Sequence, residues 1–192
     1  MHSSLGRLLL VVSLAAGLAG CAAAHRTEML REDELTDAQN AIAQTKINRG
    51  DMTIQASVDH PDTTYNPGEP ITLSVRTSKD AYVAILRVLP NGDTTIVYPN
   101  RAHRDASIAA NRPLTTQVPA GKPGIVLFEF VSSTDKKPWL FKREPDNGSD
   151  FANLGVSTHN LAKDIVSGLK VGTGPETAAT YIIVRVAGRD VF

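Results

Sequence analysis

Residues 81–98 read AYVAILRVLPNGDTTIVY, a pattern typical of two β-strands joined by a tight turn. The first half is apolar almost throughout, and residues 94–98 are again rich in β-branched and aromatic side chains. Between them, Asn91 and Gly92 form a dipeptide that favours a hairpin, because both residues tolerate a positive φ angle. We therefore predict a core hairpin with both turn residues in the left-handed region.

Two further strands precede this hairpin. Apolar and polar residues alternate over residues 52–58 and again over residues 71–75, as expected for strands with one buried face. The tripeptide at residues 66–68, Asn-Pro-Gly, predicts a turn between them, since proline presets one dihedral angle and glycine tolerates the positive one that follows.

Three strands and one helix follow the hairpin. Prolines bound residues 114–118, which predicts a strand at a sheet edge. Residues 125–131 and 181–187 are apolar apart from one charged residue each, so both are expected to be central strands. Helical spacing between them predicts a helix that starts after Thr158 and ends at Gly172. Its apolar positions are Leu161, Ile165, Val166 and Leu169.

About seven strands and one inserted helix predict a mainly β fold, an immunoglobulin-like antiparallel β-sandwich over residues 51–192. Residues 21–50 form a polar tether in front of it, in which Thr36 and Gln39 have capping-box spacing. The tether helix either docks on the domain or belongs to a solvated spacer. Its weakly apolar stripe comprises Ala38, Ala41, Ile42 and Thr45.

A family resemblance is carried by the turns and strands at the start of the sandwich. The sequence is YNPGEPITLSV at residues 65–75 and KDAYV at residues 79–83, followed by Asn91-Gly92 and Tyr98-Pro99-Asn100. This order and spacing resembles the bacterial family called domain of unknown function 4384, over about residues 52–140. The resemblance implies an envelope or secreted β-sandwich module and assigns no functional residue.

Residues 1–20 have the pattern of a secretory signal peptide. Arg7 precedes an apolar run over residues 8–16, and small residues follow just before Cys21. The run is shorter than the roughly 20 apolar residues that a spanning helix needs. Cys21 is the only cysteine of the chain, which excludes an internal disulfide.

Leu18, Ala19, Gly20 and Cys21 resemble a bacterial lipobox. Leu18 would fill an apolar subsite of the signal peptidase, and Ala19 and Gly20 would let the backbone enter its cleft. The resemblance implies a triacylated Cys21, and several acyl chains anchor a protein stably where one does not. A plain secretory signal is the alternative. Ala22 stands where lipoproteins retained in the inner membrane often carry Asp, so we expect a periplasm-facing protein of the outer membrane.

The composition argues against nucleic acid as a partner, because 20 basic and 20 acidic side chains leave no net charge. The chain lacks the common motifs for a nucleophile, a metal or an organic cofactor, so we predict none of these and no catalysis. The alternative hypothesis is an envelope hydrolase, whose site would be assembled from His103, Asp105 and Glu129. Glu129 lies in an apolar strand, which for this role predicts a carboxylate with a raised pKa. It is alternatively an outward-facing residue or the partner of Arg185.

The loop over residues 99–105 begins with a turn in which the side chain of Asn100 is expected to bond to the following backbone. It is locally basic, with Arg101 and Arg104 close to a single acid. Arginine forks suit carboxylates, so both arginines are candidates for binding an anionic envelope partner. Further along, Trp139, Phe141 and Phe151 flank the polar loop at residues 142–150. These aromatic residues either form a binding surface or anchor the loop to the core.

The function that these features favour is a non-catalytic outer-membrane lipoprotein that binds an envelope protein or a cell-wall polymer. A tethered module needs no active site, since anchoring raises its local concentration. The alternatives are the envelope hydrolase and an accessory lipoprotein of a secretion system.

Overall fold

The structure, a computed structural model, describes residues 32–45, 47–155, 158–169 and 174–188. Cys21, the lipobox residues before it and Gly172 lie outside the described residues. Within the described part, the chain forms ten β-strands, two α-helices and two short 3-10 helices.

The strands are β1 (Ile54–Val58), β2 (Thr64–Tyr65), β3 (Pro70–Thr77), β4 (Ala81–Val88), β5 (Thr94–Tyr98), β6 (Ser107–Ile108), β7 (Leu114–Pro119), β8 (Gly124–Ser133), β9 (Ala152–Gly155) and β10 (Thr177–Val186). The helices are η1 (Glu32–Glu34), α1 (Asp37–Ala43), η2 (Trp139–Phe141) and α2 (Thr158–Leu169).

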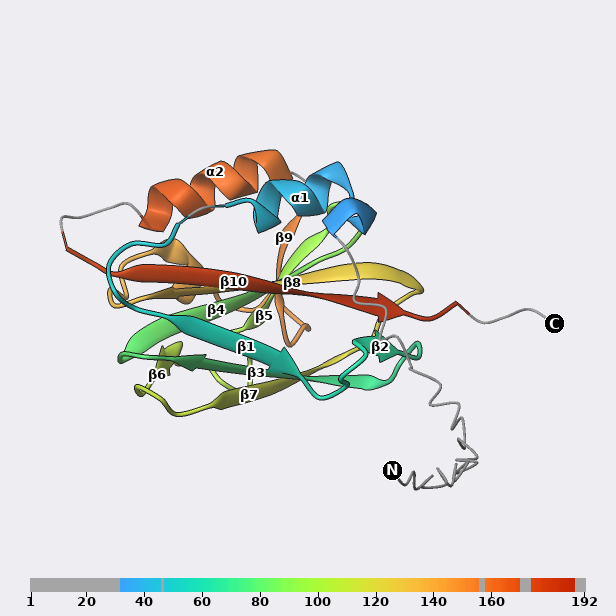
Figure 1. Cartoon of the computed structure of the whole chain (residues 1–192), viewed down its shortest axis with the longest axis horizontal. Helices are drawn as coiled ribbons and strands as arrows, with labels where there is room; N and C mark the ends of the chain where they lie inside the picture. Colours follow the sequence, from blue (N-terminus) through green and yellow to red (C-terminus); the bar gives the residue numbers. More distant parts are fainter. Residues whose placement is uncertain (1–31, 46, 156–157, 170–173, 189–192) are drawn as a thin grey trace, which may run out of the picture.

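The strands form a sandwich of two sheets, with the helices as a third layer (Figure 1). The large sheet has the order β2-β10-β8-β4-β5-β9, and β6 pairs with β4. The small sheet has the order β1-β3-β7. All pairs are antiparallel except the short parallel pair of β2 and β10. The predicted mainly β sandwich is therefore confirmed.

One hydrophobic core fills the space between the two sheets. The small sheet contributes Ile71, Leu73 and Val75 from β3, each at most 1% exposed. The large sheet contributes Phe128 and Phe130 from β8, which are fully buried. As predicted, β8 and β10 are inner strands with a partner on each side, and β7 lies at an edge.

A second core lies between the large sheet and the helices, which run side by side over its outer face (Figure 1). From α2, Leu161, Ile165 and Leu169 are buried there, in agreement with the predicted helical spacing. From α1, Ile42 is fully buried. The helix of the tether is thus docked on the domain.

The docking of α1 also depends on a buried amide. The predicted capping box is present: Thr36 accepts a hydrogen bond from the backbone N–H of Gln39, and the Gln39 side chain accepts one from the N–H of Thr36. The same Gln39 side chain donates to the carbonyls of Val88 and Ile125 at 3.0 and 2.9 Å. One residue therefore caps the helix and fixes it to the sheet.

The strand count differs from the predicted number of about seven. The additional strands β2, β6 and β9 are two to four residues long. Segments this short are held by pairing with a longer neighbour and carry too few residues for a visible alternation. The parallel pairing of β2 with β10 joins segments far apart in the chain, which local sequence patterns do not show.

The core hairpin joins β4 to β5 as predicted, but its turn differs. Gly92 has a φ angle of +88°, whereas Asn91 does not have a positive φ angle. The N–H of Gly92 donates to the carbonyl of Leu89, and the N–H of Leu89 donates to the carbonyl of Asp93, both at 2.9 Å. Because Pro90 sets a negative φ in this turn, the chain uses a longer loop with a single left-handed residue.

Candidate functional site

The loop that follows β5 is held by a buried asparagine. Asn100 is 6% exposed, and its side-chain amide donates to the carbonyl of Val97 at 3.0 Å. Its side-chain oxygen accepts the N–H of His103 at 2.9 Å, as the sequence predicts for this turn. The hydroxyl of Tyr98 donates to the carbonyl of Asp105 at 2.6 Å. The loop is therefore fixed at both ends.

A second segment faces this loop and starts at η2. Phe141 is 2% exposed and packs in the helix-side core. The chain then continues as the polar loop of residues 142–150, where the Asp146 carboxylate accepts the N–H of Asn153 at 2.8 Å. The Asp146 carboxylate also lies 4.0 Å from Arg143. A buried aromatic ring thus anchors the start of this loop, and internal hydrogen bonds order it.

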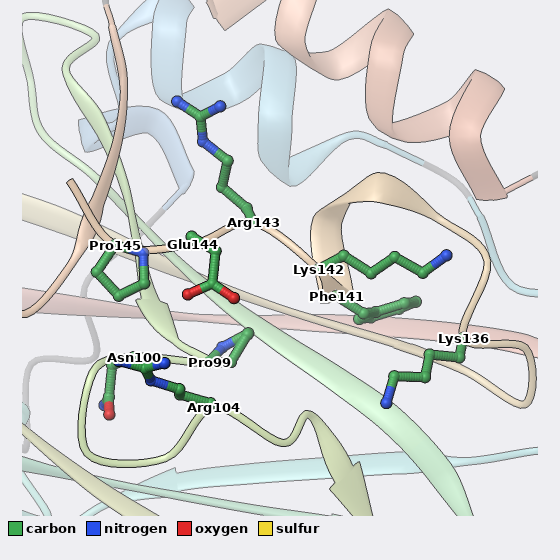
Figure 2. A pocket seen from close by; sticks show the side chains of 9 residues that line it. All are labelled: Pro99, Asn100, Arg104, Lys136, Phe141, Lys142, Arg143, Glu144 and Pro145. Atoms are coloured by element: carbon green, nitrogen blue, oxygen red, sulfur yellow. The ribbon is translucent and has the colours of Figure 1, made fainter.

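The two segments enclose a pocket of about 200 Å³ (Figure 2). Its lining residues are Pro99, Asn100, Arg104, Lys136, Phe141, Lys142, Arg143, Glu144 and Pro145. Four of these are basic and one is acidic, although the whole chain carries no net charge. Arg143 lies beside Asp146, so the other three basic residues supply the positive charge of this concave place, which attracts anions.

The structure separates the two candidate arginines of the basic loop. Arg104 lines the pocket. Arg101 does not; its guanidinium donates to the carbonyl of Asp146 at 3.4 Å, and its N–H donates to the carbonyl of Asp150 at 3.0 Å. Arg101 therefore ties the two loops together, and Arg104 faces the space between them.

Three charged residues that line the pocket have side chains without a partner in the described part of the chain. Within the described part of the chain, the side chains of Arg104, Lys142 and Glu144 make no hydrogen bond and no ion pair. Lys136 lies with its ammonium nitrogen 5.6 Å from the ring centre of Tyr82, in a cation–π arrangement. The pocket can therefore offer several cationic donors to an incoming anion without first breaking a strong contact.

The sequence interpretation missed half of this site. Lys136 was not predicted, and Lys142, Arg143 and Glu144 entered only as part of the polar loop at residues 142–150, without a role of their own. Residues 136–144 read KKPWLFKRE, a basic run interrupted by aromatic residues, which was a usable signal. Nothing local indicated that this run faces the loop after β5, because the two are brought together only by the sheet.

The flanking aromatic residues act mainly as anchors. Phe141 is buried, Phe151 packs against the core between the sheets, and Trp139 packs against the helix-side core. The ring of Trp139 lies so close to α2 that a Cβ at Gly168 would be only 3.2 Å from it. Phe141 alone among the three lines the pocket.

The residues of the hydrolase alternative lie in different settings. His103 and Asp105 are exposed in the loop, and the Asp105 carboxylate accepts bonds from the N–H and the hydroxyl of Ser107, which lower its pKa. Glu129 is 2% exposed in the large sheet. None of the three lines the basic pocket. The structure thus does not assemble them around it.

Glu129 is neither outward-facing nor paired with Arg185. Arg185 instead bonds to Glu34 at 2.7 Å. Burial raises the pKa of the Glu129 carboxyl well above its ordinary value, and its Oε2 atom has no hydrogen-bond partner within the described residues. Of the sequence expectations for this residue, the raised pKa is the one that agrees with the structure.

The residues that carry the family resemblance have structural roles. Tyr65 is 1% exposed, and its hydroxyl donates to Asp59 at 2.7 Å. The ring of His60 stacks on Tyr65 at 4.3 Å, and its Nδ1 lies 2.8 Å from the carbonyl of Thr64. Glu69 accepts the N–H of Asn66 at 2.8 Å across the predicted turn. This network of hydrogen bonds and ring stacking orders the chain around β2 and the turn that follows it.

The comparison with protein families agrees with these residues. A family described as domain of unknown function (DUF4384) matches residues 64–127, a segment that begins at β2 and ends within β8. The resemblance seen in the sequence is therefore confirmed for this segment. The comparisons with curated proteins and with solved structures gave no significant match. The basic pocket combines residues inside and beyond the matched segment.

Two further features of the described residues bear on function. They contain no cluster of three or more His, Cys, Asp or Glu side chains that could hold a metal ion. None of their helices combines the length and the apolar character that crossing a bilayer requires.

Proposed function

We propose that this protein is a lipid-anchored envelope protein whose sandwich binds an anionic partner in the basic pocket. The observation that carries the proposal is that Arg104 lines one concavity with Lys136 and Lys142, which lie far from it in the sequence. The proposed anchor is the acylated Cys21, and the proposed location is the periplasmic side of the outer membrane. The proposed role is binding and not catalysis.

The ordered backbone around the pocket supports binding of a partner. Arg104 extends from a loop whose turn is fixed by Asn100, and Lys142 follows the buried Phe141. Donors held on ordered backbone lose less conformational entropy on binding than donors on a flexible chain. Planar arginine forks match carboxylates in particular.

The proposed lipid anchor would favour binding in the pocket. A lipid anchor at Cys21 confines the domain to a thin layer at the membrane, where the concentration of envelope partners that it meets is raised. A weak pocket is sufficient under these conditions, because two linked attachments act together.

Crosslinking in living cells tests the proposal. A photo-crosslinking amino acid at Asn147, in the exposed part of the polar loop, would capture partners at the pocket. The double variant Arg104→Glu, Lys142→Glu reverses the charge there and should abolish the crosslinks. The matched control is Arg112→Glu, Lys122→Glu, which reverses two exposed cations outside the pocket and should keep them. Crosslinks that survive the first double variant contradict the proposal.

The anchor is tested separately through Cys21→Ser. The wild-type protein should fractionate with the outer membrane and incorporate a labelled fatty acid. The variant should lose the label and the membrane association. If Cys21→Ser is still cleaved and fractionates normally, the lipid anchor is wrong while the pocket is unaffected.

A further inference from the structure

The pocket already contains one carboxylate of the chain itself. Glu144 is the single acidic residue among the lining residues. Figure 2 shows its carboxylate directed to the side of the pocket where Pro99 and Arg104 lie, whereas the guanidinium of Arg143 is directed away. Since Glu144 makes no hydrogen bond or ion pair within the described residues, its carboxylate lines the pocket without being locked to a cation.

The size and the walls of the pocket limit its ligand. Its volume of about 200 Å³ lies below the roughly 300–1,000 Å³ of pockets for drug-sized molecules. Pro145 is partly exposed and supplies apolar surface beside the cations, whereas Pro99 and Phe141 line the pocket but are largely buried. The complementary ligand is therefore a small group that has an anion next to an apolar substituent.

We infer that the pocket binds the terminal carboxylate of a peptide that ends in a small apolar residue, and that Glu144 holds the place of this carboxylate in the free protein. This inference rests on the proposed function and names the ligand chemistry of the same site. Binding displaces Glu144 from the side of Arg104. Glu144 therefore weakens the site toward every anion and selects for those that also bury an apolar group against Pro145.

The lining residues fit a carboxylate better than a phosphate. Phosphates are commonly held by several backbone N–H groups at glycine-rich turns or helix N-termini. No glycine lines this pocket, and two of its residues are prolines, which have no N–H. The carboxylate of Glu144 also repels a dianion more strongly than a monoanion.

Isothermal titration calorimetry on the purified full-length protein in detergent tests this inference. The probes are N-acetyl-L-Ala-L-Ala, N-acetyl-D-Ala-D-Ala, the C-terminal amide of each, and inorganic phosphate. We expect a free acid to bind and its amide to bind at least about tenfold more weakly, since a charge-assisted hydrogen bond is lost. Preference for the L form identifies a protein C-terminus as the source of the carboxylate, and preference for the D form identifies a cell-wall peptide. Trp139, the single tryptophan of the chain, lies on η2 and gives a second, fluorescent signal.

Three variants complete the test. Arg104→Gln should weaken binding of the free acid about tenfold or more. Glu144→Gln removes the internal competitor and should tighten binding severalfold. Arg112→Gln, an exposed cation outside the pocket, should leave the affinity unchanged. Thermal unfolding of each variant checks that the fold is intact.

Several results would overturn the inference. These are equal binding of acid and amide, tighter binding of phosphate than of both acids, and unchanged or weaker binding to Glu144→Gln. Absence of binding by every probe would also overturn it. If crosslinking in cells nevertheless depends on the charge of the pocket, the proposed function stands and only the ligand chemistry is wrong.

Discussion

The turn around Tyr65 and the rim of the basic pocket differ in whether their polar side chains have partners within the described part of the chain. In the turn, Tyr65 bonds to Asp59, and His60 lies against Tyr65 and 3.3 Å from Glu69. At the rim, Arg104 has no such partner within the described residues. Both regions are rich in polar residues, yet only one of them is internally satisfied.

This difference separates side chains that stabilise the fold from side chains that are available to bind a partner. A network of partnered groups contributes to folding, and removing one member leaves others unsatisfied. Solvated cations with no partner contribute little to folding, so their presence around a concavity needs another reason. The family resemblance rests on the first kind of region, and the proposed function rests on the second.

The largest effect is expected from Tyr65→Ala. Tyr65 is 1% exposed, so its removal leaves a cavity between the sheets and also removes the hydrogen bond that Asp59 accepts from the hydroxyl. We expect a loss of about 3–5 kcal/mol in the free energy of unfolding, measured by urea denaturation. Tyr65→Phe keeps the ring and should lose only about 1–3 kcal/mol. Equal losses for the two variants would show that the ring does not fill the core.

Glu129→Met tests the cost of a polar group that is unpartnered and buried. It replaces a carboxyl that has a raised pKa and an Oε2 atom without a partner. We expect the free energy of unfolding at neutral pH to rise by about 1–3 kcal/mol. An unchanged or lower stability would contradict the burial cost assigned to this carboxyl.

The same variant has a predictable pH dependence. Folded wild-type protein binds the Glu129 proton more tightly than the unfolded chain does, because the pKa of this carboxyl is near 4.5 in the unfolded chain and is raised by burial in the folded protein. The contribution of Glu129 to wild-type stability therefore falls as pH rises above about 4.5, and the advantage of Glu129→Met should widen over that range. Urea titrations at a series of pH values measure this difference.

A smaller effect is expected from His60→Gln in the partnered turn. The hydrogen bond to the carbonyl of Thr64 and the nearby Glu69 raise the pKa of His60 above its ordinary 6.5. Its contribution to stability is present below pH 6.5 and is lost as pH rises through the folded-state pKa. His60→Gln should flatten the dependence of the melting temperature on pH in this window. A slope equal to that of wild type would show that His60 does not contribute to the pH dependence of stability.

The smallest change in stability is expected at the rim. Arg104→Gln should alter the free energy of unfolding by less than about 0.5 kcal/mol, because the guanidinium is exposed and makes no described contact. Lys142→Gln should behave in the same way. A destabilisation comparable with that of Tyr65→Phe would show that the rim is part of the folding network, and the contrast between the two regions would fail.

Much of the fold could be predicted because its strands carry their own pattern. The strands β3, β4 and β8 are long enough for their sequences to show whether one face or both faces are buried. The spacing of apolar residues in α2 likewise places Ile165 on the buried face of that helix. The strands β2, β6 and β9 could not be predicted, since each is held by a neighbour and not by its own residues. Gln39 shows the same limit: its capping role is local, but its bonds to the sheet are not.

The candidate site divides along the same line. The sequence by itself determined the lipobox pattern at Cys21, the turn chemistry of Asn100 and the basic character of the loop that carries Arg104, because each depends on residues close together in the chain. Only the tertiary structure decided that Arg104 shares a pocket with Lys136, Lys142 and Glu144, whereas Arg101 joins the two loops. It also decided that Glu129 is buried without Arg185 as a partner. The physical reason is that charge and burial depend on which distant segments the sheet brings together.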